Sequence, residues 1–357
     1  FSILRTEDAV SRRTSLPKST PLTEAKTQTL VLTVRSLLQG MNLLRRAFRI
    51  LREDGVVALS KEGSKYVRRR LTESRHGIER LNYDVRHTQK HIFDDDWETL
   101  IILDACRYDL WEEVSGEHDF LDSAEHRSVH SPASSSREWM QANFNESYSD
   151  AMSETAYVTA NPFTRKHADE EGFALLDEVW RYGWEDELGV VPPDVVTDRT
   201  IDVARNEDAE RTLVHYMQPH FPSLRQPELG SKIRPEDNTW INSVWDKLEE
   251  GEVDRDTVWE AYRDNLHDVL ESVETLLKNH DASKVIITAD HGNGFGEGEI
   301  YGHPGYRAHR VLREVPYCVT DATDKKIHTP KHTRRETEGT DADVEKRLEA
   351  LGYLDDQ

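Results

Sequence analysis

The chain has 357 residues, of which 36% are hydrophobic and 32% are charged, and its formal net charge is −22. This length is enough for one large α/β domain with appendages or for two modest domains. The excess of carboxylates excludes a general nucleic-acid binder, because a polyanion would be repelled, and it is typical of proteins that stay soluble at high salt.

The first 90 residues differ from the rest, since residues 1–80 carry a net positive charge. Residues 1–27 are rich in Ser, Thr and Pro and predict a disordered lead-in. Residues 28–90 predict a basic helical appendage, in which Gln28–Arg52 forms a basic amphipathic helix and Lys61–Arg80 forms a second basic helix. Two interpretations stay open for this appendage: peripheral docking on an anionic membrane, or a helical lid packed on the main domain or on a second subunit.

The main domain is expected over residues 91–320 and contains four apolar runs bounded by polar residues. The runs are 99–104, 156–160, 212–217 and 284–291. Continuous apolar runs are typical of strands that are buried on both faces of a mostly parallel sheet. An amphipathic helix from Val258 to Leu277 joins the last two as a βαβ crossover. We therefore expect an open, mostly parallel α/β sheet, followed by a polar tail at 321–357 that carries a short C-terminal helix.

The location of the protein and the state of its cysteines are predicted from features that the sequence lacks. No apolar run approaches the roughly 18 residues that a transmembrane helix needs, and the first residues do not form a secretion signal. The sequence thus predicts a soluble, cytoplasmic protein, peripheral to a membrane if the appendage docks there. Cys106 and Cys318 do not have metal-finger spacing and are expected to be buried free thiols.

Candidate chemical groups lie where the predicted strands end. Ligands of open α/β sheets bind beyond the carboxyl ends of the strands. Asp104 ends the first run, and Asp290-His291 ends the last one, before a glycine-rich loop that contains Asn293 and reaches His303. Carboxylate and imidazole together suit a divalent metal ion. A strand-end aspartate can instead cap a helix, and each histidine can be structural.

A run of serines, Ser134, Ser135 and Ser136, precedes a predicted helix and is followed by Arg137. Serines at this position commonly act as N-caps. The same position puts a hydroxyl in the positive field of the helix terminus, where a phosphoryl or sulfuryl group binds well, and a metal-bound serine there is a competent nucleophile. His215 and His220 lie at and beyond a third strand end; His220 is the better placed to protonate a leaving group.

Together these features resemble the alkaline phosphatase superfamily, and in particular its sulfatase-like branch. The resemblance covers roughly residues 97–320, and Asp-His-Gly is its most specific part. It implies an α/β/α sandwich, a divalent cation (Zn, Mn, Mg or Ca) and a covalent intermediate on the nucleophile. The metal ligands would be Asp104, Asp290 and His291, while His220 and His303 would contact the transferred group or a second cation.

The resemblance makes Ser135 the nucleophile, with Ser134 and Ser136 as alternatives one residue away. The residues expected to contact substrate are Ser134, Ser136, Arg137, His215 and Asn293. Three departures from the family pattern stand out. Asp104 is not followed by a second acidic residue, the serine run lacks the proline of the sulfatase maturation motif, and Gln218 replaces an acidic ligand.

These residues predict metal-dependent hydrolysis or transfer of a phosphate or sulfate ester, with a surface-glycan or lipid-linked sugar as the expected substrate. One alternative is a sulfotransferase-type step in glycan biosynthesis. The other is a non-catalytic protein that binds a metal or an anion and retains the fold.

Overall fold

The computed structural model describes residues 83–84, 86–230 and 243–332. The predicted lead-in, the two basic helices and the short C-terminal helix lie outside these residues. Within the described ranges, no helix has both the length and the apolarity that crossing a bilayer requires.

A seven-stranded sheet in the order β2-β9-β6-β1-β5-β3-β4 organises the described part of the chain. Its strands are β1 (Thr99–Leu103), β2 (Glu125–His130), β3 (Thr155–Thr159), β4 (Leu175–Glu178), β5 (Arg211–Tyr216), β6 (Ala282–Thr288) and β9 (Glu314–Ala322). Five neighbouring strands, from β6 to β4, are parallel, whereas β9 pairs antiparallel with β6 and with β2. All residues of β1 and β3 are buried, as their unbroken apolar sequences predict.

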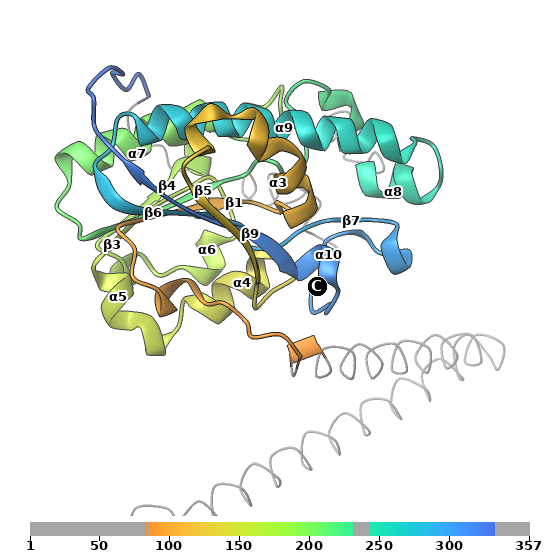
Figure 1. Ribbon diagram of the computed structural model, residues 1–357, viewed down its shortest axis with the longest axis horizontal. Coiled ribbons are helices and arrows are strands. Elements are labelled where there is room, and N and C mark those ends of the chain that lie inside the picture. Colours follow the sequence, from red (N-terminus) through yellow and green to blue (C-terminus); the bar gives the residue numbers. More distant parts are fainter. Residues whose placement is uncertain (1–82, 85, 231–242, 333–357) are drawn as a thin grey trace, which may run out of the picture. The chain divides into compact units, whose positions relative to one another are not determined.

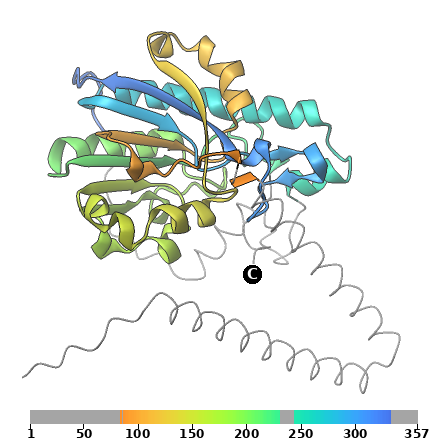
Figure 2. The same ribbon diagram turned by 60° about the horizontal axis from the view of Figure 1, so that its bottom comes forward.

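Helices cover both faces of this sheet (Figures 1 and 2). Figure 1 shows α3, α7 and α9 on one face and α4, α5 and α6 on the other. The helices are α3 (Tyr108–Val114), α4 (Ser136–Asn143), α5 (Ser149–Ser153), α6 (Thr164–His167), α7 (Pro193–Asn206), α8 (Val244–Glu249), α9 (Arg255–Leu277) and α10 (Arg310–Arg313). The three-layer α/β/α sandwich expected from the sequence is confirmed.

Short connections complete the fold. They include the two-stranded ribbon of β7 (Gly294–Phe295) and β8 (Tyr301–Gly302). The 3₁₀ helices are η1 (Ile92–Asp94), η2 (Ser115–Glu117), η3 (Asp119–Leu121), η4 (Glu146–Tyr148), η5 (Glu170–Gly172), η6 (Val179–Arg181), η7 (Pro227–Leu229) and η8 (Glu297–Glu299).

The longest helix, α9, begins and packs as its sequence predicts. Asp254 caps its N-terminus by accepting a 2.9 Å hydrogen bond from the backbone N–H of Thr257. Its apolar residues, among them Leu266 and Val273, are fully buried in the core. The helix joins β5 to β6 but passes over β1, which lies between these two strands. The expected crossover is therefore present, with one strand inserted.

The core lies between the sheet and its helices and holds both cysteines. Cys106 and Cys318 are buried free thiols, as predicted. Burial raises the pKa of Cys106 well above its usual range. Neither thiol is therefore a reactive thiolate near neutral pH.

The polar segment after β9 folds back onto α7. Asp198 of α7 accepts hydrogen bonds from the ring Nε2 of His328 at 2.6 Å and from the ring Nδ1 of His332 at 2.8 Å. The backbone N–H groups of residues 331 and 332 bind the same carboxylate. This aspartate therefore anchors a segment with little apolar character of its own.

Candidate metal and nucleophile site

Two buried aspartates define the site at the carboxyl edge of the sheet. Asp104 directly follows β1, Asp290 lies two residues after β6, and both are fully buried. The Oδ2 atom of Asp104 accepts a 2.8 Å hydrogen bond from the side-chain amide of Asn161. The Oδ1 atom of Asp290 accepts bonds from the backbone N–H groups of Ala105 at 3.0 Å and of His291 at 2.9 Å. The other oxygens, Asp104 Oδ1 and Asp290 Oδ2, have no hydrogen-bond donor.

Ala105 replaces the second acidic residue of the sulfatase pattern and has a structural part here. Its φ of 59° lies in the left-handed region, which residues with a Cβ atom seldom adopt. This conformation directs its N–H toward Asp290. A strained backbone therefore links the end of β1 to the loop after β6.

Two imidazoles face these carboxylates. The Nε2 atom of His291 lies 3.4 Å from Asp290 Oδ2 and 3.7 Å from Asp104 Oδ1. Ligand atoms of Asp104, Asp290 and His291 all lie within 4.8 Å of one another. His215, inside β5, places its Nε2 3.4 Å from Asp104 Oδ2 and 3.9 Å from Asp290 Oδ2.

The second nitrogen of each ring fixes its orientation. The Nδ1 atom of His291 contacts the carbonyl oxygen of Gly292 at 3.0 Å, and that of His215 contacts the hydroxyl of Tyr157 at 3.0 Å. Such contacts to the second ring nitrogen are the usual support of metal-binding histidines. Both Nε2 atoms are thereby held toward the carboxylates.

The electrostatics of this cluster favour a cation. Burial alone would raise the pKa of Asp104, but the nearby imidazoles of His215, His220 and His291 hold it well below its usual range. Asp104 is therefore a carboxylate, although neither it nor Asp290 has an ion pair with lysine or arginine in the described part of the chain. Buried carboxylates without such partners are costly unless they coordinate a metal. The donor set of two carboxylates and imidazole fits a divalent ion.

The structure separates the three candidate serines. The Oγ atom of Ser136, the first residue of α4, lies 3.2 Å from Asp104 Oδ2 and 3.2 Å from His291 Nε2. The Oγ atom of Ser135 is buried without a hydrogen-bond partner, although this residue is the N-cap. The Oγ atom of Ser134 contacts the carboxylate of Glu138 at 3.1 Å. Only Ser136 among the three contacts the metal-ligand candidates.

A pair of histidines lies beside this cluster. The Nε2 atoms of His220 and His303 are 2.9 Å apart, and the ring centroids of His303 and His291 are 4.7 Å apart. Burial lowers the pKa of His220, and burial together with the two neighbouring imidazoles lowers that of His303 well below its usual value. Both rings are therefore neutral near neutral pH.

His303 and Asn293 come from the same end of the β7–β8 ribbon. Gly294 pairs with Gly302 in this ribbon, so the residues just outside the pair are neighbours. Neither the oxygen nor the nitrogen of the buried Asn293 amide has a hydrogen-bond partner. A buried amide seldom lacks partners in a folded protein, so this group is available to a bound molecule.

Asn161, which holds Asp104, was not among the residues selected from the sequence. It could have been selected, because this polar residue lies two residues after the buried strand β3, just as Asp290 lies two residues after β6. The side-chain amide of Gln218 donates to the carbonyl of Val191 at 3.1 Å. Arg137 lies at the start of α4, and its guanidinium is 5.9 Å from the ring centroid of Tyr306.

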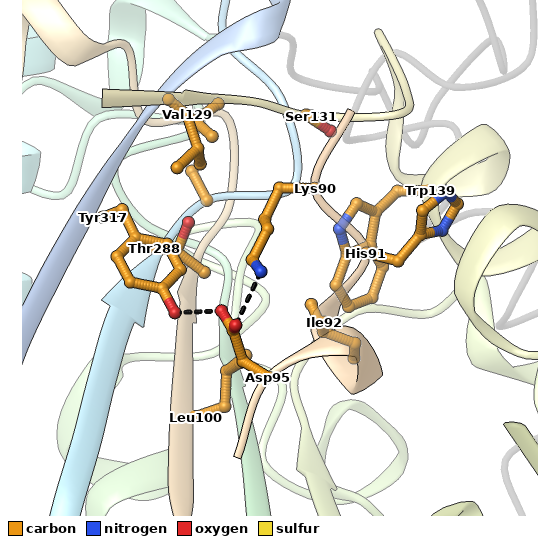
Figure 3. Close-up of a pocket in the computed structure, with 12 residues that line it drawn as sticks. Lys90, His91, Ile92, Asp95, Leu100, Val129, Ser131, Trp139, Thr288 and Tyr317 are labelled. Atoms are coloured by element: carbon orange, nitrogen blue, oxygen red, sulfur yellow. Dashed lines mark hydrogen bonds and ion pairs between the residues drawn. The ribbon is translucent and has the colours of Figure 1, made fainter. Parts of the chain in front are cut away.

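A small pocket that none of the cluster residues line has a different character. Figure 3 shows it between the segment before β1, strands β2, β6 and β9, and Trp139 of α4. The amine of Lys90 lies 2.6 Å from Asp95, whose other oxygen accepts from the hydroxyl of Tyr317. These polar groups bind one another, so the pocket is a weaker candidate for chemistry than the edge of the sheet.

Comparison with known proteins gives structural matches only. No protein-family profile and no curated protein matches the chain. The soluble domain of lipooligosaccharide phosphoethanolamine transferase A from Neisseria meningitidis matches with a TM-score of 0.42 and 15% identity, over 64% of this chain and 77% of that one. The integral membrane form of that transferase matches with a TM-score of 0.42 and 14% identity, over 88% of this chain and 66% of its own length.

A third match is the C-terminal periplasmic domain of EptC from Escherichia coli in complex with Zn, with a TM-score of 0.36 and 13% identity, over 67% of this chain and 76% of that one. These descriptions contradict the predicted cytoplasmic location, because the matched chains are a periplasmic domain and an integral membrane protein. That prediction depended on a missing transmembrane run and a missing secretion signal, and neither absence fixes a compartment.

Proposed function

We propose that the chain catalyses metal-dependent transfer or hydrolysis of a phosphate or sulfate ester, with Ser136 as the nucleophile. One observation carries this proposal: the hydroxyl of Ser136 lies within 3.2 Å of Asp104 and of His291, which belong to the buried carboxylate–imidazole cluster. Two oxygens of that cluster lack donors, as a cation site requires. Ser135, the serine favoured by sequence alone, makes no such contact.

Asp104, Asp290 and His291 would hold the cation, with His215 beside them. When bound, the cation supplies positive charge that lowers the pKa of a serine hydroxyl and offsets the charge of the transferred group. Ser136 is at the first position of α4, whose first-turn N–H groups lie at the positive end of the helix. This position favours an anionic phosphoryl or sulfuryl group next to the hydroxyl.

The expected reaction forms a bond from Ser136 Oγ to phosphorus or sulfur and breaks the bond to the leaving oxygen. The serine proton is lost, and the leaving oxygen gains a proton, so that the net products are a serine ester and an alcohol. Asp104 Oδ2, 3.2 Å from Ser136 Oγ, is placed to accept the hydroxyl hydrogen bond. The neutral His220–His303 pair would contact the transferred group, and the leaving oxygen would take its proton from solvent water. A water or an alcohol acceptor then takes the group from the serine.

The choice between water and an alcohol separates a hydrolase from a transferase. A surface-glycan or lipid-linked sugar is the substrate class we propose to test. The experiment compares aryl phosphate monoesters, phosphate diesters and sulfate esters at high salt, with Zn, Mn, Mg or Ca, with and without a sugar acceptor. We expect turnover of one ester class that requires metal and Ser136.

The same experiment tests the alternatives. Turnover of a sulfate ester that appears only with a sugar acceptor would support the sulfotransferase-type step. Metal binding without turnover of any ester, and without labelling of a serine by phosphate or sulfate, would instead support the non-catalytic binding protein. That outcome would refute the proposed reaction.

A further inference from the structure

We infer that Trp245 is a positioning residue, whose indole holds the His220–His303 pair in register. This inference rests on the proposed function, in which that pair serves the transferred group. Trp245 lies in α8, outside the metal cluster, and is partly buried. Its importance follows from its contacts, because it packs against residues next to both histidines in the chain.

The first contact is with Gly302, which immediately precedes His303. Gly302 has a φ of +65°, and a Cβ atom built there would lie 2.9 Å from Cδ1 and 3.1 Å from Cγ of the Trp245 indole. Heavy atoms do not approach that closely, so only a glycine allows the ribbon backbone to lie directly on this ring. The indole therefore limits how far the end of β8, and His303 with it, can approach α8.

The second contact is with Phe221, which immediately follows His220. The ring centroids of Trp245 and Phe221 are 5.3 Å apart, in an edge-to-face arrangement with an interplanar angle of 77°. The ring Nδ1 of His220 also contacts the carbonyl oxygen of Phe221, which ties the imidazole to this residue. One indole thus contacts the neighbours of two histidines whose Nε2 atoms are 2.9 Å apart.

The loop that carries His220 is also held by α9, and Trp245 joins this loop to the ribbon. The side-chain amide of Asn265 in α9 donates to the carbonyls of His220 and Pro222 at 3.1 and 3.0 Å. The loop is thereby fixed to α9 through its backbone. The wedge of Trp245 between Gly302 and Phe221 then sets the distance from this fixed loop to His303.

Trp259 provides a matched control in the same aromatic cluster. Its ring centroid lies 5.0 Å from that of Phe295, and the centroid of Trp245 lies 5.2 Å from the same ring. Trp259 contacts Phe295 and Tyr262 and donates its indole N–H to Glu113. Replacing either tryptophan by alanine removes the same side chain from one cluster, but only Trp245 lies on Gly302 and Phe221.

The first test measures the geometry without requiring turnover. Ring ¹⁵N NMR spectra of histidine-labelled protein, assigned with His303→Ala, report the hydrogen bond between the two Nε2 atoms. We expect Trp245→Ala to abolish the shifts of His220 and His303 that arise from this bond, while Trp259→Ala preserves them. Equal spectra for Trp245→Ala and wild type would overturn the inference, even if the protein turned over no ester.

The second test is a double-mutant cycle on kcat, with the Phe variant as the conservative control. We expect Trp245→Ala to lower kcat at least tenfold and Trp245→Phe less than threefold, while Trp259→Ala stays within twofold at a similar loss of melting temperature. Gly302→Ala should lower kcat more in the presence of Trp245 than in the Trp245→Ala background. The backbone strain of alanine at residue 302 is common to both backgrounds and cancels.

Equal factors for Gly302→Ala in the two backgrounds would show that the indole does not act through the ribbon, and would refute the inference. Equal losses of kcat for the two tryptophan variants would also refute it, because they would indicate a structural role alone. Absence of wild-type turnover with the expected NMR result would leave the positioning by Trp245 intact and remove the proposed reaction.

Discussion

Two variants, Ser135→Ala and Ser136→Ala, test which serine is the nucleophile. The structure favours Ser136, whereas the sequence pattern favours Ser135. Ser135 and Ser136 are both buried, and each exchange removes one oxygen atom at the start of α4. Only the Oγ of Ser136 contacts the carboxylate–imidazole cluster, at two distances of 3.2 Å. The two variants therefore perturb the packing by nearly the same amount, but only Ser136→Ala removes a hydroxyl that contacts the cluster.

The two variants are expected to differ in kcat, and Ser135→Ala is not expected to lower the free energy of unfolding. If Ser136 forms the covalent intermediate, its loss should lower kcat by a factor on the order of 10³ or more, equivalent to about 4 kcal/mol of transition-state free energy. Ser135 buries a hydroxyl without a partner, which costs about 1–3 kcal/mol. Ser135→Ala should therefore keep kcat within a few-fold and leave the free energy of unfolding equal or higher.

The assay combines turnover of the preferred ester at saturating metal with denaturant unfolding of both variants. Mass spectrometry of acid-quenched protein should find the transferred group on Ser136. A large loss of turnover in Ser135→Ala with little loss in Ser136→Ala, or a label on Ser135, would refute the assignment. It would restore the nucleophile predicted from sequence.

Three further predictions follow from other contacts. Asp290→Asn removes the charge of a proposed metal ligand, so affinity for Zn or Mn measured by calorimetry should fall at least about tenfold; unchanged affinity would mean that the metal binds elsewhere. Gly292→Ala would place a Cβ 2.3 Å from the carbonyl oxygen of Val311, whereas a Cβ at Gly116 meets no atom within 4 Å. We expect thermal unfolding to show a loss of about 1–3 kcal/mol for the first and a change within about 0.5 kcal/mol for the second, and similar values would contradict the packing. Burial alone would raise the pKa of Asp198, but hydrogen bonds from its two histidine partners and two backbone N–H groups lower it. Its stabilisation is thus present above the unfolded pKa of about 3.9 and is lost as pH falls through the folded-state pKa. The difference in unfolding free energy between wild type and Asp198→Asn should shrink below about pH 4; a constant difference would exclude this linkage.

The central strands were readable from sequence because they are buried on both faces. β1, β3, β5 and β6 each present an unbroken apolar run, and each ends close to its predicted limit. The edge strand β2 could not be predicted from the sequence, because Glu125–His130 is mostly polar and no residue in it is fully buried. β9 was not predicted either, and its last two residues were placed in the polar tail, since its antiparallel pairing with β6 extends past the apolar residues to Ala322.

Part of the site could also be predicted from the sequence, because the ends of the buried strands could be predicted. The rule that ligands lie beyond strand ends placed Asp104 and Asp290 at one edge, and they lie there, although their role stays a prediction. The rule says nothing about His215, which is inside β5, since the face to which a strand residue points depends on the neighbouring helices. The choice of Ser136 over Ser135 depends on where α4 begins, to within one residue, and a run of serines does not contain that information.

The candidate ligands are far apart in the sequence, between residues 104 and 303, and meet only where β1, β5 and β6 are assembled. A cation bound there would link these three central strands without a covalent bond, and an unfolded chain would have no equivalent site. Binding to the native state alone adds about 2.7 kcal/mol of stability at a hundred times the dissociation constant. The supply of metal would then control how much folded protein persists, in addition to how fast it works.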